Sequence, residues 1–124
     1  IEDMLPQGGQ GALGIEIRND AQEVDNLVKT LDDSESHLSI DAERALLLRL
    51  GGGCQVPIGV YAQVHDIQIS IKAGVFSLDG KISVRDEIAG PKEDAESLGS
   101  KLAERILKKG AKQILDKLIV QIKD

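Results

Sequence analysis

The residue best suited to covalent chemistry is the single cysteine, Cys54, which lies in the stretch LRLGGGCQVPIGVYA at residues 48–62. Three glycines precede it, and Pro57 follows three residues later. Irregular backbone that is buried away from water leaves polar groups unpaired, so a loop of this kind is expected at the surface. The sequence therefore predicts a thiol that is presented outward on a loop.

Three interpretations of Cys54 stay open on the residues alone: an incidental small apolar residue, a metal ligand, or a nucleophile. Metal binding would need His37 and His65, the two histidines of the chain, and their spacing from Cys54 fits no local ligand pattern. We therefore predict no metal site.

As a nucleophile, Cys54 would receive little help from its neighbours. It follows a predicted helix end, whose partial negative charge disfavours a thiolate, while Arg44 and Arg49 on that helix act in the opposite direction. No histidine with an Asn or Asp partner is placed to activate the thiol. A reaction at Cys54 would therefore require an electrophile that is intrinsically reactive.

The elements that position this loop follow from the hydrophobic periodicity. Residues 12–18 (ALGIEIR) alternate like a half-buried strand, but no partner strand lies nearby in sequence. Residues 20–31 and 32–50 each carry an apolar stripe at helical spacing after an acidic capping signal, at Asp20 and Asp32. Leu46 is expected on the buried face of the second helix, and Gly51 is placed to end it.

From residue 55 onward the period changes to two, and three strand-like runs follow, the last two separated by an Asp79-Gly80 turn. Pro91 is expected at the first position of a helix, and Gly110 is expected to break or kink it. The predicted fold class is α+β: a three-stranded antiparallel sheet covered by helices and preceded by a strand that belongs to a missing domain.

Composition limits the possible functions. A chain of 124 residues with 41% hydrophobic residues buries one modest core, and its net charge of −6 disfavours nucleic acid and anionic membrane surfaces as partners. One cysteine is consistent with a reducing compartment, and no apolar run reaches the roughly 18 residues of a membrane span. We expect a cytoplasmic protein. Because the chain starts at Ile1 and runs directly into strand-like sequence, we expect a fragment.

Two segments resemble the porphobilinogen deaminase family, also called hydroxymethylbilane synthase. AERALLLRLGGGCQVPIGVYA (residues 42–62) is similar to the cofactor-attachment segment of that family, and MLPQGGQGALGIEIR (residues 4–18) is similar to the glycine-rich segment ahead of it. The two motifs occur in the family's order and at its spacing. Two departures, Gly51 in place of an acidic residue and Gln7-Gly8 in place of a more apolar pair, leave the thiol untouched.

The resemblance implies a three-domain transferase that links four porphobilinogen units into hydroxymethylbilane, the linear precursor of haem and other tetrapyrroles. It implies that a dipyrromethane primer is held by a thioether to Cys54, and that Gln10 and Gly11 line the cleft near this cofactor. Residues 1–18 would return to the preceding domain, and residues 19–124 would form the C-terminal cofactor-attachment domain. The catalytic aspartate and most carboxylate-binding arginines of the family would lie upstream, so no catalytic residue is expected in this chain.

The resemblance also defines the expected partners: porphobilinogen, the growing pyrrole chain and the missing N-terminal domains. The fragment produced alone is expected to be inactive and to lack its primer. Residues 12–18, without a partner strand, are expected to be poorly ordered or paired in a non-native way, for example with a second copy. The alternative from another class is a small noncatalytic α+β interaction domain in which Cys54 is incidental.

Overall fold

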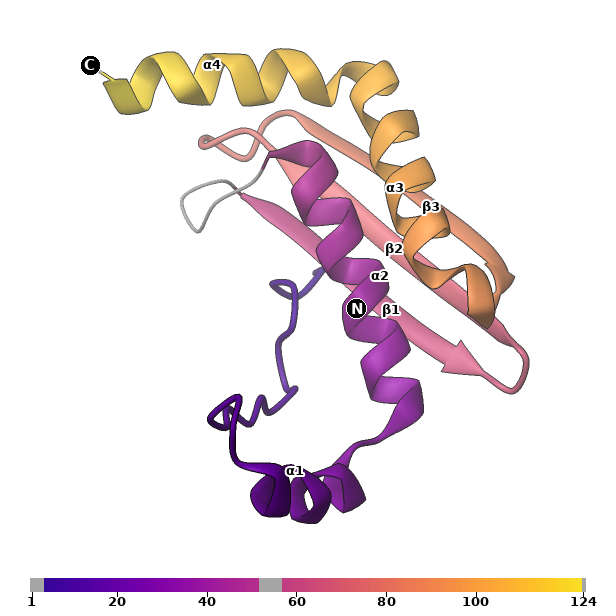
Figure 1. Cartoon of the computed structure of the whole chain (residues 1–124). Coiled ribbons are helices and arrows are strands. Elements are labelled where there is room, and N and C mark those ends of the chain that lie inside the picture. The colour runs from indigo at the N-terminus through magenta and orange to yellow at the C-terminus, as the bar shows by residue number, and fades with distance from the viewer. Residues whose placement is uncertain (1–3, 52–56, 124) are drawn as a thin grey trace.

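The computed structural model describes residues 4–51 and 57–123, with side chains up to residue 118. Two helices lie on one face of a three-stranded sheet, and the chain before them starts beside β1 and then runs to α1, which lies away from the sheet (Figure 1). In chain order the elements are α1 (Gln22–Val28), η1 (Lys29–Leu31), α2 (Ser34–Leu50), β1 (Ile58–His65), β2 (Gln68–Phe76), β3 (Ser83–Pro91), η2 (Lys92–Asp94), α3 (Ala95–Ile106), η3 (Leu107–Ala111) and α4 (Lys112–Lys123).

The sheet is an antiparallel meander with the strand order β1-β2-β3. Its register pairs Ala62 with Ile71 and Ile71 with Ile88. The predicted turn between the last two strands is confirmed: Gly80 has a φ of 73°, and Asp79 accepts hydrogen bonds from Ser77 and from the backbone of Lys81. The α+β fold class is therefore confirmed.

The core lies between the sheet and the two helices. Alternate residues of β1 and β2, from Val60 to Val75, are buried against α2 and α3, whereas Tyr61, Gln63 and Lys72 point to the opposite face. Among the described residues no helix covers that second face (Figure 1). The largest side chains with almost no exposure are Leu46, Ile69, Ile71, Leu102, Ile106, Val60 and Val75.

The helix ends differ from two of the predicted caps. The side chain of Asp33, not Asp32, accepts the backbone N–H of Ser36 at 3.2 Å and caps α2. Ala21, not Asp20, is the N-cap of α1 and makes no side-chain cap. Asp20 instead pairs with Arg18, which precedes α1, and Asp32 pairs with the side chain of His37 in the first turns of α2.

The predicted strand at residues 12–18 does not form in this structure, since these residues have no regular secondary structure. A strand is stabilised by hydrogen bonds to a neighbouring strand, and none is available to this segment in the described chain. Leu13 is 97% exposed, and the apolar stripe of α1 and η1, including Leu27 and Leu31, is exposed as well. The predicted helix at 20–31 is present, but the described residues do not bury its apolar face.

The last part of the chain runs from the sheet into two helices joined at a kink. Pro91 is the final residue of β3 and the N-cap of η2, rather than the first residue of a helix as predicted. The N–H of the next residue, Lys92, donates to the carbonyl of Ile67 at 3.0 Å. Gly110, with a φ of 119°, confirms the predicted kink, and α4 then crosses the end of the sheet (Figure 1). Within the described residues, none of these helices combines the length and the apolar character that crossing a membrane requires.

Leu46 is the centre of the contact between α2 and the sheet and has no exposed surface. We expect Leu46→Ala to lower the free energy of unfolding by about 2 to 5 kcal/mol, because it removes buried methyl groups and leaves a cavity. Urea titration measures this loss. Leu48→Ala, at a position 82% exposed on the same helix, is the matched control. A loss below about 0.5 kcal/mol at Leu46 would contradict the assigned core.

Candidate functional site

Cys54 itself lies outside the described residues, but both ends of its loop are described. The loop leaves α2 at Gly51, which adopts the left-handed conformation (φ 70°, ψ 25°) and donates its N–H to the carbonyls of Leu47 and Leu48. Glycine adopts this conformation without strain, so α2 ends here. The loop returns at Pro57, whose carbonyl accepts the N–H of Phe76 on β2 at 3.0 Å. The cysteine segment is thus attached to the core at both ends.

The cations of the last two turns of α2 are Arg44 and Arg49. Arg49 pairs with Glu104 of α3 at 3.2 Å, while Arg44 lines a cavity toward the start of the helix. The several carboxylates of a dipyrromethane primer would need further cations besides these two. Residues outside this chain would have to supply them.

Gln10 and Gly11, the other two predicted site residues, lie in a pair of exposed turns. The N–H of Gln10 donates to the carbonyl of Gln7, and the N–H of Ala12 donates to the carbonyl of Gly9, both at 3.1 Å. Gly11 has a φ of 86°, which favours glycine at this position. Gln10 and Gly11 therefore form a turn, and their position near a cofactor stays a prediction.

The segment that carries this turn is fixed to the domain along the outer edge of β1. The N–H of Val60 donates to the carbonyl of Pro6 at 2.9 Å. Gly59 faces Leu5 so closely that an added Cβ would lie 2.6 Å from the Leu5 Cβ and 3.0 Å from its carbonyl oxygen. The approach therefore requires glycine at residue 59.

Glu43 is the site residue that sequence reasoning missed. Its side chain on α2 is buried, one carboxylate oxygen accepts the N–H of Gly9 at 2.8 Å, and the other accepts the N–H of Ala62 at 3.2 Å. The signal was present in the sequence, because Glu43 shares the buried helical stripe with Leu46 and Leu50. An acidic residue on such a stripe requires buried hydrogen-bond donors.

Burial raises the pKa of Glu43 above its usual value of 4.5, and the N–H groups of Gly9 and Ala62 act in the opposite direction. The loss of hydration is the larger effect, because a buried carboxylate loses more solvent than two backbone donors replace. Glu43 therefore connects three segments while its charged form is held in an unfavourable environment.

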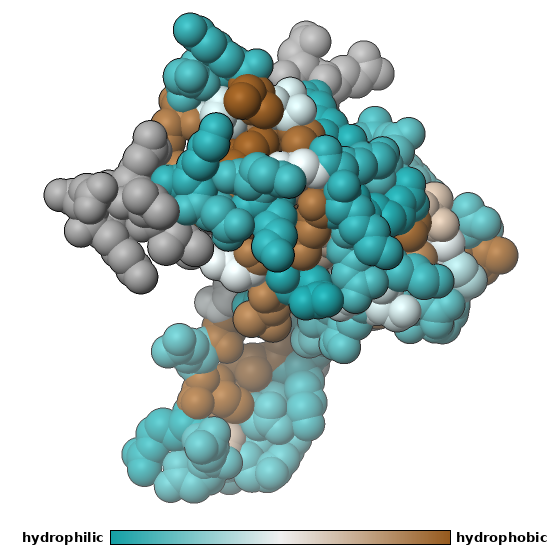
Figure 2. All heavy atoms as spheres, turned by 90° about the horizontal axis from the view of Figure 1, so that it is seen from above, coloured by the Kyte–Doolittle hydropathy of each residue, from teal (hydrophilic) through white to brown (hydrophobic). Residues whose placement is uncertain are grey.

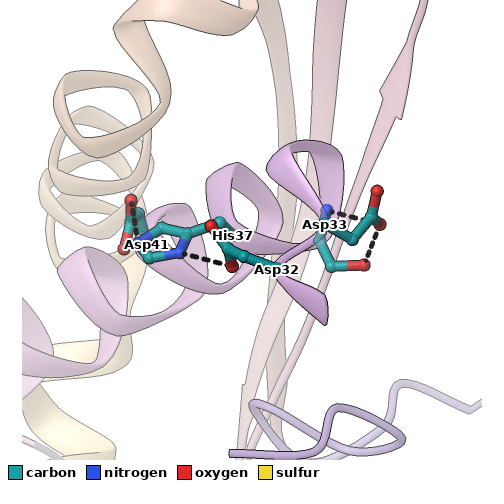
Figure 3. A network of polar contacts seen from close by, with 5 residues as sticks. Asp32, Asp33, His37 and Asp41 are labelled. Carbon is teal, nitrogen blue, oxygen red and sulfur yellow. Dashed lines mark hydrogen bonds and ion pairs between the residues drawn. The ribbon is translucent and has the colours of Figure 1, made fainter. Parts of the chain in front are cut away.

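The two histidines that were considered as metal ligands lie in different elements, His37 in the first turns of α2 and His65 at the end of β1. His37 lies between two aspartates, with its Nδ1 3.4 Å from Asp32 and its Nε2 3.7 Å from Asp41 (Figure 3). His65 is exposed at the end of β1. Across residues 4–51 and 57–123, no three His, Cys, Asp or Glu side chains are grouped to hold a metal ion.

His37 borders a half-open cavity of about 650 Å³ between residues 11–17 and the helices that follow them. Its lining combines apolar side chains, including Leu13, Ile15 and Val28, with charged ones such as Asp41. Figure 2 shows apolar surface interrupting the hydrophilic exterior of the molecule. The cavity and the exposed stripe of α1 are continuous with the segment that failed to form a strand.

These features define an α+β domain whose single cysteine lies, in sequence, in the glycine-rich segment between α2 and the edge strand β1. The sequence model described as "Porphobilinogen deaminase, C-terminal domain" matches residues 37–108. A protein named porphobilinogen deaminase from Carboxydothermus hydrogenoformans is 45% identical over 114 residues, which cover 92% of this chain. The chain belongs to the porphobilinogen deaminase family and corresponds to its C-terminal domain. It spans 37% of the length of that relative.

The raised pKa of Glu43 predicts a pH dependence of stability. A raised folded-state pKa means that the contribution to stability is fully present below the usual value and is lost as the pH rises through the folded-state value. We therefore expect the free energy of unfolding of the wild type, minus that of Glu43→Gln, to fall as the pH rises from about 4 to 8. Urea titrations at several pH values measure this difference.

The control for this experiment is Glu35→Gln, which removes a negative charge from an exposed position on the same helix. Subtracting its effect isolates the part that depends on burial. A wild-type minus Glu43→Gln difference that rises with pH would show that the two N–H donors outweigh the loss of hydration.

Proposed function

We propose that this chain is the cofactor-bearing part of a hydroxymethylbilane synthase, with a dipyrromethane primer attached to Cys54 through a thioether. The observation that carries the proposal is the family match, which includes the loop between α2 and β1 that holds the single cysteine. The substrate would be porphobilinogen, which the full enzyme would deaminate and polymerise. The bound primer would supply the pyrrole carbon on which the chain is extended.

The described residues support a carrier role for this domain. Gly51 ends α2 just before the cysteine segment, and the Pro57 carbonyl is bonded to β2 just after it, so the described residues on both sides of that segment are fixed. Glycines inside the segment leave space for a bulky substituent. Attachment would add the Cys54 sulfur to the exocyclic methylene carbon of a methylene-pyrrolenine, and the thiol proton would pass to the ring nitrogen, which restores the pyrrole. No strong activation of the thiol is needed for such a partner.

We further propose that an upstream part of the polypeptide covers the apolar surface at the start of the chain. Leu13, Leu27 and Leu31 are between 70% and 97% exposed, which is unusual for three large apolar residues on neighbouring segments. The relative from Carboxydothermus hydrogenoformans is long enough to provide a covering domain, since this chain spans only 37% of it. Residues 1–18 would then belong to that domain and residues 19–124 to the cofactor-attachment domain.

The chain produced alone is expected to carry Cys54 as a free thiol and to lack deaminase activity. The family assembles its primer in an active site whose catalytic groups are implied to lie upstream, so the isolated chain has no means to load itself. Intact-mass measurement should give the unmodified sequence mass, and thiol titration should find one reactive group that disappears in Cys54→Ser. A mass increase of two linked pyrroles on the isolated chain would contradict this prediction.

The function itself is tested in the polypeptide that includes the upstream part. Ehrlich's reagent should give the colour of a bound dipyrromethane, and Cys54→Ser should abolish both the colour and the consumption of porphobilinogen. Cys54→Ser that keeps the colour would move the attachment site elsewhere. A complete protein that neither colours nor consumes porphobilinogen would instead support the noncatalytic interaction domain.

A further inference from the structure

Glu43 is placed where three segments meet that are far apart in sequence. Its helix leads into the cysteine loop, Ala62 lies on the strand that follows that loop, and Gly9 lies beside the Gln10-Gly11 turn. Each carboxylate oxygen accepts one backbone N–H, from a different segment. An amide in its place would keep one acceptor oxygen and carry N–H donors at the other position. Protonation would put an O–H on one of the two oxygens, so the carboxylate is the form with two full acceptors.

The segment of residues 5–9 depends on few other contacts. Its backbone is joined to β1 by the Val60 N–H donating to the Pro6 carbonyl, and Gly59 leaves the space that Leu5 occupies. Gly8 lies against Leu47, where an added Cβ would come 2.6 Å from a methyl group. Beyond residue 9 the chain forms exposed turns and continues without regular structure to residue 18. The hydrogen bond from the Gly9 N–H to Glu43 therefore attaches residues 5–9 to α2 directly before the chain becomes exposed.

We propose that Glu43 is a positioning residue whose carboxylate fixes residues 5–9 to β1 and α2. It thereby holds the Gln10-Gly11 turn beside β1, the strand that follows the Cys54 segment in the chain. This inference rests on the proposed function for the meaning of the turn, whereas the clamp itself is a property of the chain. A buried carboxylate that loses hydration is retained here because it specifies one arrangement of three segments.

The clamp is tested by amide hydrogen exchange, followed by NMR, on this chain at neutral pH. Glu43→Ala should reduce the protection of the Gly9 and Ala62 amides at least tenfold, because both lose their acceptor. Glu43→Gln should reduce the protection of one of the two amides more than the other, because a single carbonyl oxygen remains. The amides of Ile71 and Ala73 at the centre of the sheet should keep their protection.

A general loss of stability is separated from the clamp by a matched variant. Ile69→Val shortens a buried side chain that makes no hydrogen bond to Glu43 and therefore lowers the global stability without touching the clamp. The urea concentration at its unfolding midpoint is compared with that of Glu43→Gln. At equal global stability, Ile69→Val should leave Gly9 protected. Gly59→Ala should act from the opposite side, by displacing Leu5 and lowering the protection of Val60 and Gly9 while Glu43 is intact.

In the polypeptide with the upstream part, Glu43→Gln should lower the turnover of porphobilinogen while Ehrlich's reagent still detects primer on Cys54. Unchanged Gly9 protection in folded Glu43→Gln and Glu43→Ala would overturn the clamp. Lost Gly9 protection with unchanged turnover in a loaded enzyme would overturn its positioning role. A complete protein without primer or activity would count against the proposed function, and the exchange result for the isolated chain would stand independently.

Discussion

The arrangement of this domain depends on how the backbone N–H groups on the outer edge of β1 find hydrogen-bond acceptors. A three-stranded open sheet leaves backbone N–H groups of an edge strand without a partner, and such edges are covered in native proteins. Here the N–H of Val60 donates to the Pro6 carbonyl and that of Ala62 donates to Glu43, so the edge is covered by an incoming segment and a side chain rather than by a fourth strand. Because α2 delivers Glu43 and ends at the cysteine loop, the same helix covers the edge and presents the loop.

Two acidic residues show how the domain accommodates carboxylates in different environments. Glu43 receives only backbone N–H donors in a buried position, and loss of hydration raises its pKa. Asp86 on β3 also loses hydration, but the N–H of Glu87 and the cations Lys109 and Arg105 outweigh that effect and lower its pKa. Asp86 thus joins the sheet to the end of α3 through charge, whereas Glu43 joins segments through directional hydrogen bonds that hold them in one register.

Local patterns predicted the fold well, because each element carries its own signal. Period-two alternation gave the meander with its Asp79-Gly80 turn, and helical stripes gave α2 with buried Leu46 and the kink at Gly110. The cap positions were wrong by one residue, since neighbouring aspartates offer equivalent side chains and tertiary contacts decide which one caps. The strand expected at residues 12–18 is a different case: alternation describes a strand that has a partner, and the described residues of this chain supply none, as its assignment to a missing domain implies.

The candidate site was predictable only in part. A lone cysteine among glycines is visible in the sequence, but Glu43 joins residues 34 and 19 positions away, and such pairings follow from packing rather than from local pattern. The acidic residue on the buried stripe of α2 nevertheless indicates that donors must meet it. Under the proposed function, a cysteine that carried a growing chain would need room around its own segment and a fixed geometry in the residues beside it. One short stretch of sequence provides for both requirements: glycines directly precede the cysteine, and the buried carboxylate of Glu43 lies one helix turn before Leu46.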